Sequence, residues 1–508
     1  MIFSNLAILA SLIPLSAAAA ASANIKGLLQ DRSNQWSAET TVYFPGDSQF
    51  TNETLRWNEY SAPTFLAVIR PGSQQDVQKV VKIATSNNVP FLATGGRHGY
   101  GTQFGRLQNG LEIDMSSFKT VQVDKDNNTL TVGGAVHFGD IVDPLYAAGK
   151  EIQTGSATCV GLVGASLGGG IGRYQGFHGL ILDALLSLRM VTAAGDIIDV
   201  SETSNSDLFW AMRGAGTNFG VILSATYKVS DLTHGGQVMN ADMIFPGSAN
   251  ASFFEMIQGM QDKIPKELSL IASMAYNATS KTVRPSQTLV RQVSEQCQPE
   301  IIANFVYIGP EDDGRKVIKP FLNLSPMVQE ISTVPWNQLL SKAAFGATAL
   351  ECIKGNQHSM FGVNVRNISA STYIDVFEKM TDFWTRENAA QGSSFSIEFF
   401  SNAAMVAVPQ DATAYPWRDT KAYLMLQMTW TNADAADSAN HLAKQLRSQL
   451  VNTSGYPQHS VYVSYAHGDE PLASKFGASK LPRLAEMKKR WDPSNVFAYG
   501  ASLPEQYP

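Results

Sequence analysis

The sequence is poor in cysteine, carries no excess of positive charge and lacks a long apolar run beyond its N-terminus. Its three cysteines, Cys159, Cys297 and Cys352, are an odd number, which excludes complete pairing. A Cys297–Cys352 disulfide is one interpretation and three buried thiols are the other. The net charge of −6 disfavours nucleic acid as a partner. No later segment is long and apolar enough to predict a membrane span.

Several motifs are also absent. No Gly-x-x-x-x-Gly-Lys-Ser/Thr sequence occurs, which disfavours a P-loop nucleotidase. The stretch GGGIGRYQG resembles a dinucleotide-binding fingerprint only loosely, because it follows a glycine-rich loop and no ribose-binding acid follows at the right spacing. The eight histidines are scattered without ligand spacing, so no metal site is predicted.

The N-terminus indicates export. Residues 1–23 are apolar and end in Ala21-Ser22-Ala23, which fits the cleavage pattern of a secretory signal peptide. Seven Asn-x-Ser/Thr triplets agree with a secreted glycoprotein. They begin at Asn52, Asn127, Asn250, Asn277, Asn323, Asn367 and Asn452.

The length predicts two to three structural units. From residue 64 to 230 the pattern alternates between strands and helices, and the first helix repeats apolar residues at helical spacing after Ser73, a plausible N-cap. The rhythm changes near residue 235. From there to about 460 helices alternate with apolar strands, which we interpret as a substrate chamber. The tail predicts a strand in HSVYVSYAHGDE and a helix ending at Asp492-Pro493.

Three glycine-rich segments stand out: FLATGGRHGYG, GLVGASLGGGIGRYQGFHG and RGAGTNFG. Glycine lets backbone N–H groups approach an anion, and successive N–H groups form a nest for phosphate. A single such loop is often only a turn. Three in one domain predict a large ligand with a pyrophosphate and an extended arm.

Together with VIRPGSQQDVQKVVKIA, GLEIDM, VYVSYAHGDE and RWDPSNVFAYG, these segments carry a family resemblance. The sequence resembles the berberine-bridge-enzyme-like branch of the vanillyl-alcohol-oxidase flavoproteins over about residues 60–500. The resemblance implies an α+β fold with a bipartite PCMH-type FAD-binding domain at 60–235. A substrate domain at 236–460 would lay an antiparallel sheet and helices over the flavin, and residues 461–508 would return to the FAD domain.

The resemblance makes His98 the covalent attachment point of FAD, at the flavin 8α-methyl group, and imidazole is a competent nucleophile. A histidine that only hydrogen-bonds a phosphate is the alternative. Arg97 stands where relatives often have glycine. Because arginine adopts a positive φ only at a cost, we expect that freedom on Gly95, Gly96 or Gly99. Arg97 is interpreted either as charge near the pyrophosphate or as a solvated surface residue. The expected cofactor-binding residues are Gly95, Gly96, Arg97, His98, Gly99, Val160, Gly164, Gly168, Gly169, Gly170, Gly172, Asn218, Phe219, Gly220 and Val221.

Many relatives carry a second flavin bond from a cysteine. Aligning on LGGGIG places Ala157 there, and Cys159 lies two residues further along, so we favour a single bond through His98 over a second link at Cys159. Val160 matches a small apolar position that leaves dioxygen a path to the flavin; a buried valine in a strand is the other interpretation, and the two are compatible.

The resemblance places Tyr465 over the flavin ring as the first candidate base, with Tyr100 and Gln427 as further catalytic or substrate-facing residues. A tyrosine base would need its pKa lowered. Core packing is the alternative for each, and His467 is a weaker candidate base.

We therefore expect a secreted FAD-linked oxidase that removes hydride from an alcohol or an activated C–H of a small molecule, with dioxygen reduced to hydrogen peroxide. A secondary metabolite is the first substrate hypothesis and an oligosaccharide the second. A flavin dehydrogenase with another acceptor and a non-catalytic flavin-binding protein are the rival functions.

Overall fold

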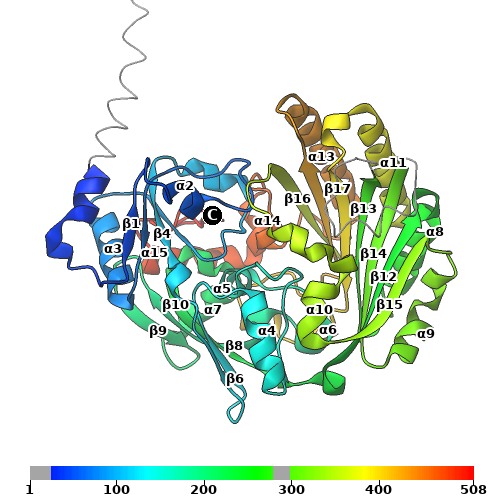
Figure 1. The fold of residues 1–508 in the computed structure, drawn as a ribbon, viewed down its shortest axis with the longest axis horizontal. Helices are drawn as coiled ribbons and strands as arrows, with labels where there is room; N and C mark the ends of the chain where they lie inside the picture. Colours follow the sequence, from blue (N-terminus) through cyan, green and yellow to red (C-terminus); the bar gives the residue numbers. More distant parts are fainter. Residues whose placement is uncertain (1–23, 278–297, 508) are drawn as a thin grey trace, which may run out of the picture.

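The computed structural model of the protein describes residues 24–277 and 298–507. The predicted signal peptide and Cys297 lie outside the described residues. Figure 1 shows two halves, one holding the N-terminal third of the chain together with the C-terminal helices, the other built around one large sheet. The mixture of helices and largely antiparallel sheets confirms the predicted α+β class.

The first sheet leads directly into the opening glycine loop. Its order is β1 (Thr41–Tyr43), β2 (Phe65–Arg70), β4 (Gly110–Asp114) and β3 (Phe91–Thr94). Between β2 and β3 runs α3 (Gln74–Ser86), whose apolar face is buried against this sheet. The Ser73 hydroxyl accepts a hydrogen bond from the Asp76 N–H at 3.2 Å, which confirms the predicted N-cap.

The second sheet completes the half that contains the predicted FAD-binding domain, hereafter the FAD-binding half. It is antiparallel, with the order β5 (Val121–Asp124), β6 (Thr129–Gly133), β10 (Val221–Lys228), β8 (Leu185–Val191) and β9 (Ile197–Ser201). The helices of this half are α2 (Phe50–Thr54), α4 (Phe138–Ala147), α5 (Leu162–Gly168), α6 (Gln175–His178), α7 (Ser206–Ala215), α14 (Leu472–Phe476) and α15 (Leu481–Trp491). A two-stranded ribbon pairs β7 (Lys150–Glu151) with β11 (Ser230–Asp231).

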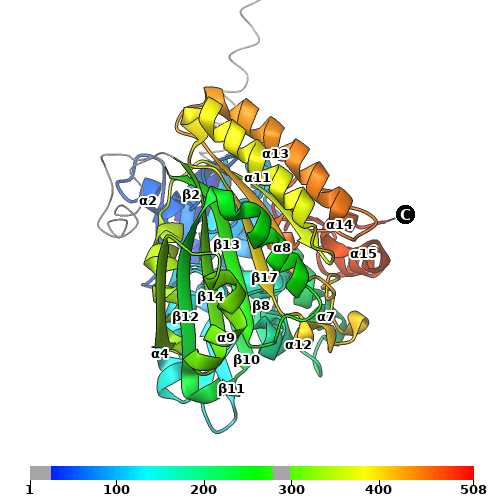
Figure 2. The same ribbon diagram turned by 90° about the vertical axis from the view of Figure 1, so that its right-hand side faces the viewer.

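The third sheet has seven antiparallel strands. Their order is β15 (Val328–Pro335), β12 (Gln237–Pro246), β14 (Gln298–Ile308), β13 (Leu268–Asn277), β17 (Ser394–Phe400), β18 (Ala422–Thr429) and β16 (His358–Val365). Its outer face is covered by α8 (Asn250–Met260), α9 (Glu311–Leu322), α11 (Ala370–Arg386) and α13 (Asp434–Thr453), as Figure 2 shows. Between the halves lies α10 (Trp336–Lys342), as Figure 1 shows, and α12 (Ala403–Val406) contacts α6.

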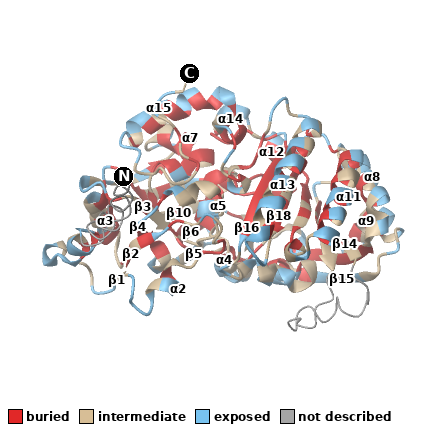
Figure 3. Ribbon diagram, turned by 90° about the horizontal axis from the view of Figure 1, so that it is seen from above, coloured by how far each residue is buried: buried red, intermediate tan, exposed pale blue. Residues whose placement is uncertain are grey.

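The two faces of the seven-stranded sheet differ in chemistry, because side chains alternate along each strand. The face under the helices is an apolar core, and Figure 3 shows buried residues along β16 and β18 beside α13. The opposite face carries Asp242, Asn304, Glu398 and Gln427 in neighbouring strands. This polar face turns toward the FAD-binding half.

The tail differs from its prediction in one respect. The helix is confirmed as α15, which ends at Trp491, but HSVYVSYAHGDE forms no strand. The Asn364 N–H donates to Ser460 O at 2.8 Å, after which the chain turns into a 3-10 helix at Val463–Tyr465. That turn aims Tyr465 at the polar face. The predicted change of domain near residue 235 falls in a 3-10 turn, Thr233–Gly236, just before β12.

Within residues 24–277 and 298–507, every helix is too short or too polar to cross a bilayer.

Candidate active site

The loop after β3, Gly95–Gly101, has unused hydrogen-bond donors. None of the backbone N–H groups from Gly96 to Gly101 donates to a protein acceptor among the described residues. The loop lies directly on the segment before α5: a Cβ added to Gly96 would come within 2.8 Å of the Gly161 nitrogen. Unpaired N–H groups in a tight glycine loop form a cradle for an anion.

Arg97 contradicts two expectations from the sequence, that a glycine takes the positive φ and that Arg97 is a surface residue. It takes the left-handed conformation itself, with φ 55°, where the sequence predicted this freedom on a glycine. Its side chain is only 8% exposed, so it is not a solvated surface residue. The guanidinium Nε donates to Glu112 Oε1 at 2.7 Å, and Nη2 pairs with Asp114 Oδ1 at 3.1 Å. These buried ion pairs offset the backbone strain and fix the residue before His98.

A second buried arginine supports the same loop. Arg56 donates from Nη2 to the Gly99 carbonyl at 3.1 Å, and it is 3% exposed. Its Nη1 has no hydrogen-bond partner among the described residues. A buried guanidinium N–H without a partner is costly unless a ligand accepts it.

His98 is held as a neutral ring. It stacks on Trp57, with ring centroids 4.5 Å apart, and Trp57 stacks in turn on His358 at 4.8 Å. Burial lowers the pKa of His98. The Nε2 atom lies 2.9 Å from the Glu351 carbonyl oxygen. Because a carbonyl only accepts, Nε2 carries the proton and Nδ1 keeps its lone pair.

Cys159 is bonded to Cys352. The predicted Cys297–Cys352 disulfide is therefore wrong, as is the interpretation of three buried thiols. A sulfur committed to Cys352 has no thiolate with which to attack a flavin, which agrees with the preference for His98 over Cys159.

Most glycines of the second segment face protein. A Cβ on Gly172 would lie 2.0 Å from the Thr154 carbonyl oxygen, and one on Gly168 would meet Val463 at 2.8 Å. Gly169 and Gly170 have positive φ values, 148° and 84°. Close packing or backbone conformation explains why glycine occupies these four positions. Gly164, by contrast, has no atom within 4 Å of an added Cβ. A cofactor could reach the four only through their backbone.

The third segment is likewise bound into the fold. The Asn218 amide donates to the carbonyls of Ala215 and Ala501, both at 3.1 Å, and its oxygen accepts the Leu503 N–H at 2.9 Å. Phe219 is fully buried, and Gly220 packs on Met190. The side chains of Asn218 and Phe219 therefore join the C-terminus to the FAD-binding half, and Val221 begins β10.

Glu398 on β17 is a candidate site residue that sequence reasoning missed. It is 7% exposed, and burial raises its pKa to about 7, against the lowering effects of Tyr465 and Arg173. The Tyr465 hydroxyl donates to Glu398 Oε2 at 2.9 Å. A lone carboxylate in the apolar strand SFSIEFF was the available signal, since a buried unpaired acid is rare.

The three predicted catalytic residues lie around the same polar face. Burial, followed by the charge of Glu398, raises the pKa of Tyr465 well above 10, so the lowered pKa that a tyrosine base needs is not met. Tyr100 lies 3.7 Å from Met425 Sδ through its hydroxyl, and its pKa is also raised by burial. Gln427 Nε2 lies 3.5 Å from His358 Nδ1. His467, the weaker candidate, stacks on Phe361 at 4.0 Å and pairs with the Met360 carbonyl.

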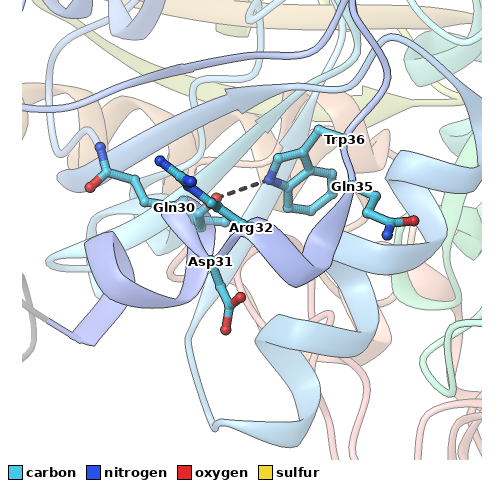
Figure 4. Close-up of a pocket in the computed structure, with 6 residues that line it drawn as sticks. Gln30, Asp31, Arg32, Gln35 and Trp36 are labelled. Atoms are coloured by element: carbon cyan, nitrogen blue, oxygen red, sulfur yellow. Dashed lines mark hydrogen bonds between the residues drawn. The ribbon is translucent and has the colours of Figure 1, made fainter.

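Other features lie apart from this site. A shallow hollow at the N-terminal edge is lined by residues of one local segment, Leu29–Trp36, and the Trp36 indole donates to the Leu29 carbonyl there (Figure 4). It contains none of the predicted site residues. In the described part of the chain no group of three or more His, Cys, Asp or Glu side chains is placed to hold a metal ion.

Two family profiles match the chain. One, described as FAD binding domain, matches residues 65–201, and the other, described as Berberine and berberine like, matches residues 461–504. The chain is 42% identical over 494 residues to the FAD-linked oxidoreductase fogF of Aspergillus ruber, covering 96% of each chain. It is 43% identical over 473 residues to the FAD-linked oxidoreductase OXR1 of Pyricularia oryzae, covering 92% of this chain and 90% of the relative.

The chain belongs to the berberine-like FAD-linked oxidoreductases.

Solved structures show the same fold for this FAD-linked oxidoreductase. Wild-type BBE-like 1 of Physcomitrella patens superimposes with a TM-score of 0.79 at 22% identity, over 92% of this chain and 98% of that one. An Acremonium strictum glucooligosaccharide oxidase, described as having a novel flavinylation, gives 0.78 at 20% identity, over 97% and 99%.

The residues of this oxidoreductase fit FAD. The free N–H groups of Gly96–Gly101 and the unpartnered Arg56 Nη1 are donors for a pyrophosphate or a polar ring edge. His98, with Nδ1 unprotonated, lies in the same loop. The polar sheet face opposite carries a hydrogen-bonded pair, Glu398 and Tyr465.

Proposed function

We propose that the protein is a secreted oxidase that removes hydride from an alcohol or activated C–H of a small molecule and passes the electrons to dioxygen, giving hydrogen peroxide. The observation that carries this proposal is Glu398, a buried carboxylate with a pKa of about 7 on the face opposite the His98 loop. Bound FAD supplies the two-electron acceptor. The chain supplies binding, orientation and proton transfer.

In this proposal Glu398 takes the proton from the substrate O–H or N–H. A general base works best when its pKa lies near the operating pH, and a value of about 7 meets this condition. Tyr465, whose pKa is raised, stays protonated and donates its hydrogen bond to the carboxylate. We therefore move the base from Tyr465, the residue expected from the sequence, to Glu398, and make Tyr465 its orienting partner.

Covalent attachment of the flavin through His98 belongs to the same proposal. A neutral imidazole with a free Nδ1 is the reactive form of a histidine nucleophile. The stack on Trp57 and the hydrogen bond to Glu351 O hold the ring in that form. Val160, whose carbonyl accepts the Phe138 N–H, remains the proposed residue beside the dioxygen path.

A small secondary metabolite is the proposed substrate class. Tyr100 and Met425 are half-buried and offer an apolar surface, with Gln427 as a nearby polar contact. An oligosaccharide is the second candidate, favoured by the fold shared with a chitooligosaccharide oxidase at a TM-score of 0.77 and with a xylooligosaccharide oxidase at 0.76.

Secretion is supported by the position of the glycosylation triplets. Asn52, Asn127, Asn323, Asn367 and Asn452 are exposed, and Asn250 and Asn277 are half-buried. Glycans attached to the exposed asparagines would project into solvent and leave the hydrophobic cores undisturbed.

The decisive experiment mixes the purified holoprotein with candidate alcohols and oligosaccharides without oxygen, follows flavin bleaching, and then admits air and measures peroxide. Bleaching followed by stoichiometric peroxide is expected. Bleaching without peroxide would identify a dehydrogenase with another acceptor. A yellow protein that no compound in either class bleaches would favour a flavin-binding protein without catalysis.

A further inference from the structure

Residues Ala344–Cys352, hereafter the strap, run from the substrate half to the His98 loop. They follow α10 as a 3-10 segment. Ala344 and Phe345 are both left-handed, with φ values of 55° and 56°. Such a conformation is uncommon outside glycine and persists only where its surroundings impose it.

Asp242 imposes it at the first end of the strap. Its carboxylate, 2% exposed on β12, accepts the Ala344 N–H at 2.8 Å and the Phe345 N–H at 2.9 Å. Asn304 donates to the same carboxylate at 2.6 Å, and the Asn304 oxygen accepts from Arg173 at 2.8 and 3.1 Å. The strap therefore starts from a buried network that joins both halves.

The disulfide fixes the other end. Cys352 is bonded to Cys159, with the two Cα atoms 5.6 Å apart. Cys159 belongs to the segment that packs on the glycine loop, and its carbonyl lies 3.4 Å from the position of an added Cβ on Gly96. The last residue of the strap is thus covalently tied beside His98.

The residue before that bond contacts His98. The Glu351 carbonyl accepts the Nε2–H of His98 at 2.9 Å. Stacking on Trp57 fixes the plane of the imidazole but does not distinguish its two nitrogens, since a flipped ring stacks equally well. The carbonyl does distinguish them, because only a protonated nitrogen can face it.

We propose that the strap is a positioning device for His98. Asp242 and the Cys159–Cys352 disulfide hold it so that the Glu351 carbonyl keeps Nε2 protonated and leaves Nδ1 free. This role rests on the proposed function in that the ring held in this way is the one proposed to carry the flavin.

The test compares wild type with Cys159→Ser/Cys352→Ser and with Cys297→Ser, a matched control that removes the cysteine outside the disulfide. Each protein is produced as the full chain and denatured, and the fraction of the His98 peptide that carries flavin is measured by mass spectrometry. In the flavin-free fraction, the rate at which diethyl pyrocarbonate modifies His98 is compared with the rate at exposed His441. Asp242→Asn weakens the hold on the Ala344 end of the strap. It replaces the double variant in this test if the double variant does not fold.

In the double variant we expect the flavin-bearing fraction to fall on the order of tenfold, since small misplacements of a reacting group cost up to about 100-fold. The modification of His98 should accelerate while that of His441 is unchanged, and Cys297→Ser should match wild type. A double variant with the wild-type flavin fraction and the wild-type modification rate of His98 would overturn the proposal that the strap positions His98. If wild type itself carries no covalent flavin, the proposal of attachment at His98 is wrong. The modification rates of His98 alone then test whether the strap positions the ring.

Discussion

Replacing Glu398 with glutamine tests the centre of the proposed site. Glutamine keeps the size of the side chain and an oxygen that accepts the Tyr465 hydroxyl, now 2.9 Å from Oε2. It cannot take a proton from the substrate. General-base catalysis contributes about 10²- to 10⁴-fold to rate, so flavin reduction by Glu398→Gln should slow by about that factor, with a smaller change in binding.

The pH dependence gives a second magnitude. With a pKa of about 7, Glu398 is about one tenth ionised at pH 6 and about nine tenths at pH 8. The rate of flavin reduction in wild type should therefore rise roughly tenfold between these pH values. Glu398→Gln should lose this rise.

The free energy of unfolding should fall with rising pH, whereas the rate of flavin reduction rises. The ordinary pKa of 4.5 is raised to about 7 in the fold, so between these values the folded protein holds a proton that the unfolded chain has lost. Stability therefore falls as the pH rises through this window, and above pH 7 the ionised carboxylate costs about 3 kcal/mol. Glu398→Gln should melt at a higher temperature than wild type at pH 8 and at a similar temperature at pH 4.5.

The assay is anaerobic stopped-flow reduction of the flavin at saturating substrate, with thermal melts of the same samples. Glu351→Gln is the comparison variant: it leaves the Glu351 carbonyl in place but removes a charge that raises the pKa of Glu398, so it should keep the rise in rate with its midpoint at lower pH. A Glu398→Gln enzyme that reduces flavin at the wild-type rate and keeps the rise between pH 6 and 8 would refute the assignment of the base.

Four further predictions follow from the site and its supports. Tyr465→Phe removes the hydrogen bond that lowers the pKa of Glu398, so the midpoint of the rate profile should move to higher pH; an unmoved midpoint would contradict the orienting role. Arg97→Ala leaves the buried Glu112 without its ion-pair partner, whereas Asp114 keeps its pair with Arg70, and unfolding in denaturant should show a loss of about 3–5 kcal/mol, with Arg97→Lys losing less. Cys159→Ser/Cys352→Ser opens a loop closed over 193 residues and should lose up to about 5 kcal/mol on chain entropy, measured by the same method against Cys297→Ser. Treatment of the secreted protein with an N-glycosidase should lower its mass, and its N-terminal sequence should begin at Asn24; a mature chain that retains residues 1–23 would refute the signal peptide.

Local sequence determines much of this fold. The spacing of Val77, Val80, Val81 and Ala84 and the cap at Ser73 specify α3 without help from distant residues, and they were predictable. The glycine loop was predictable for the same reason, since its function depends on its own N–H groups. The expected strand at residues 459–470 failed because Asn364 and Glu398, on other strands, determine how Tyr462 and Tyr465 turn.

The site could be predicted only in part, because its chemistry depends on contacts across the chain. Cys159 and Cys352 are separated by 193 residues, and nothing near either one indicates the other as its partner. The sequence around Arg97 does not indicate that the residue is buried. Its ion-pair partners, Glu112 and Asp114, are brought to it by β4. Glu398 interrupts an apolar strand, and the sequence gives no reason for it. The reason appears only in the fold, because the sheet places Glu398 on the face toward the FAD-binding half.

The electrostatics of the polar face argue that the site is built for a ligand. Burial lowers the pKa of Arg173 to about 10 and raises that of Glu398 to about 7, although each charge favours the ionised form of the other. They form no ion pair among the described residues, and Arg173 Nη1 has no hydrogen-bond partner there. A fold selected for stability alone would bring the two groups together, since an unpaired buried charge is costly. Keeping them apart leaves Glu398 able to gain and lose a proton and leaves Arg173 with an N–H donor that a ligand oxygen can accept.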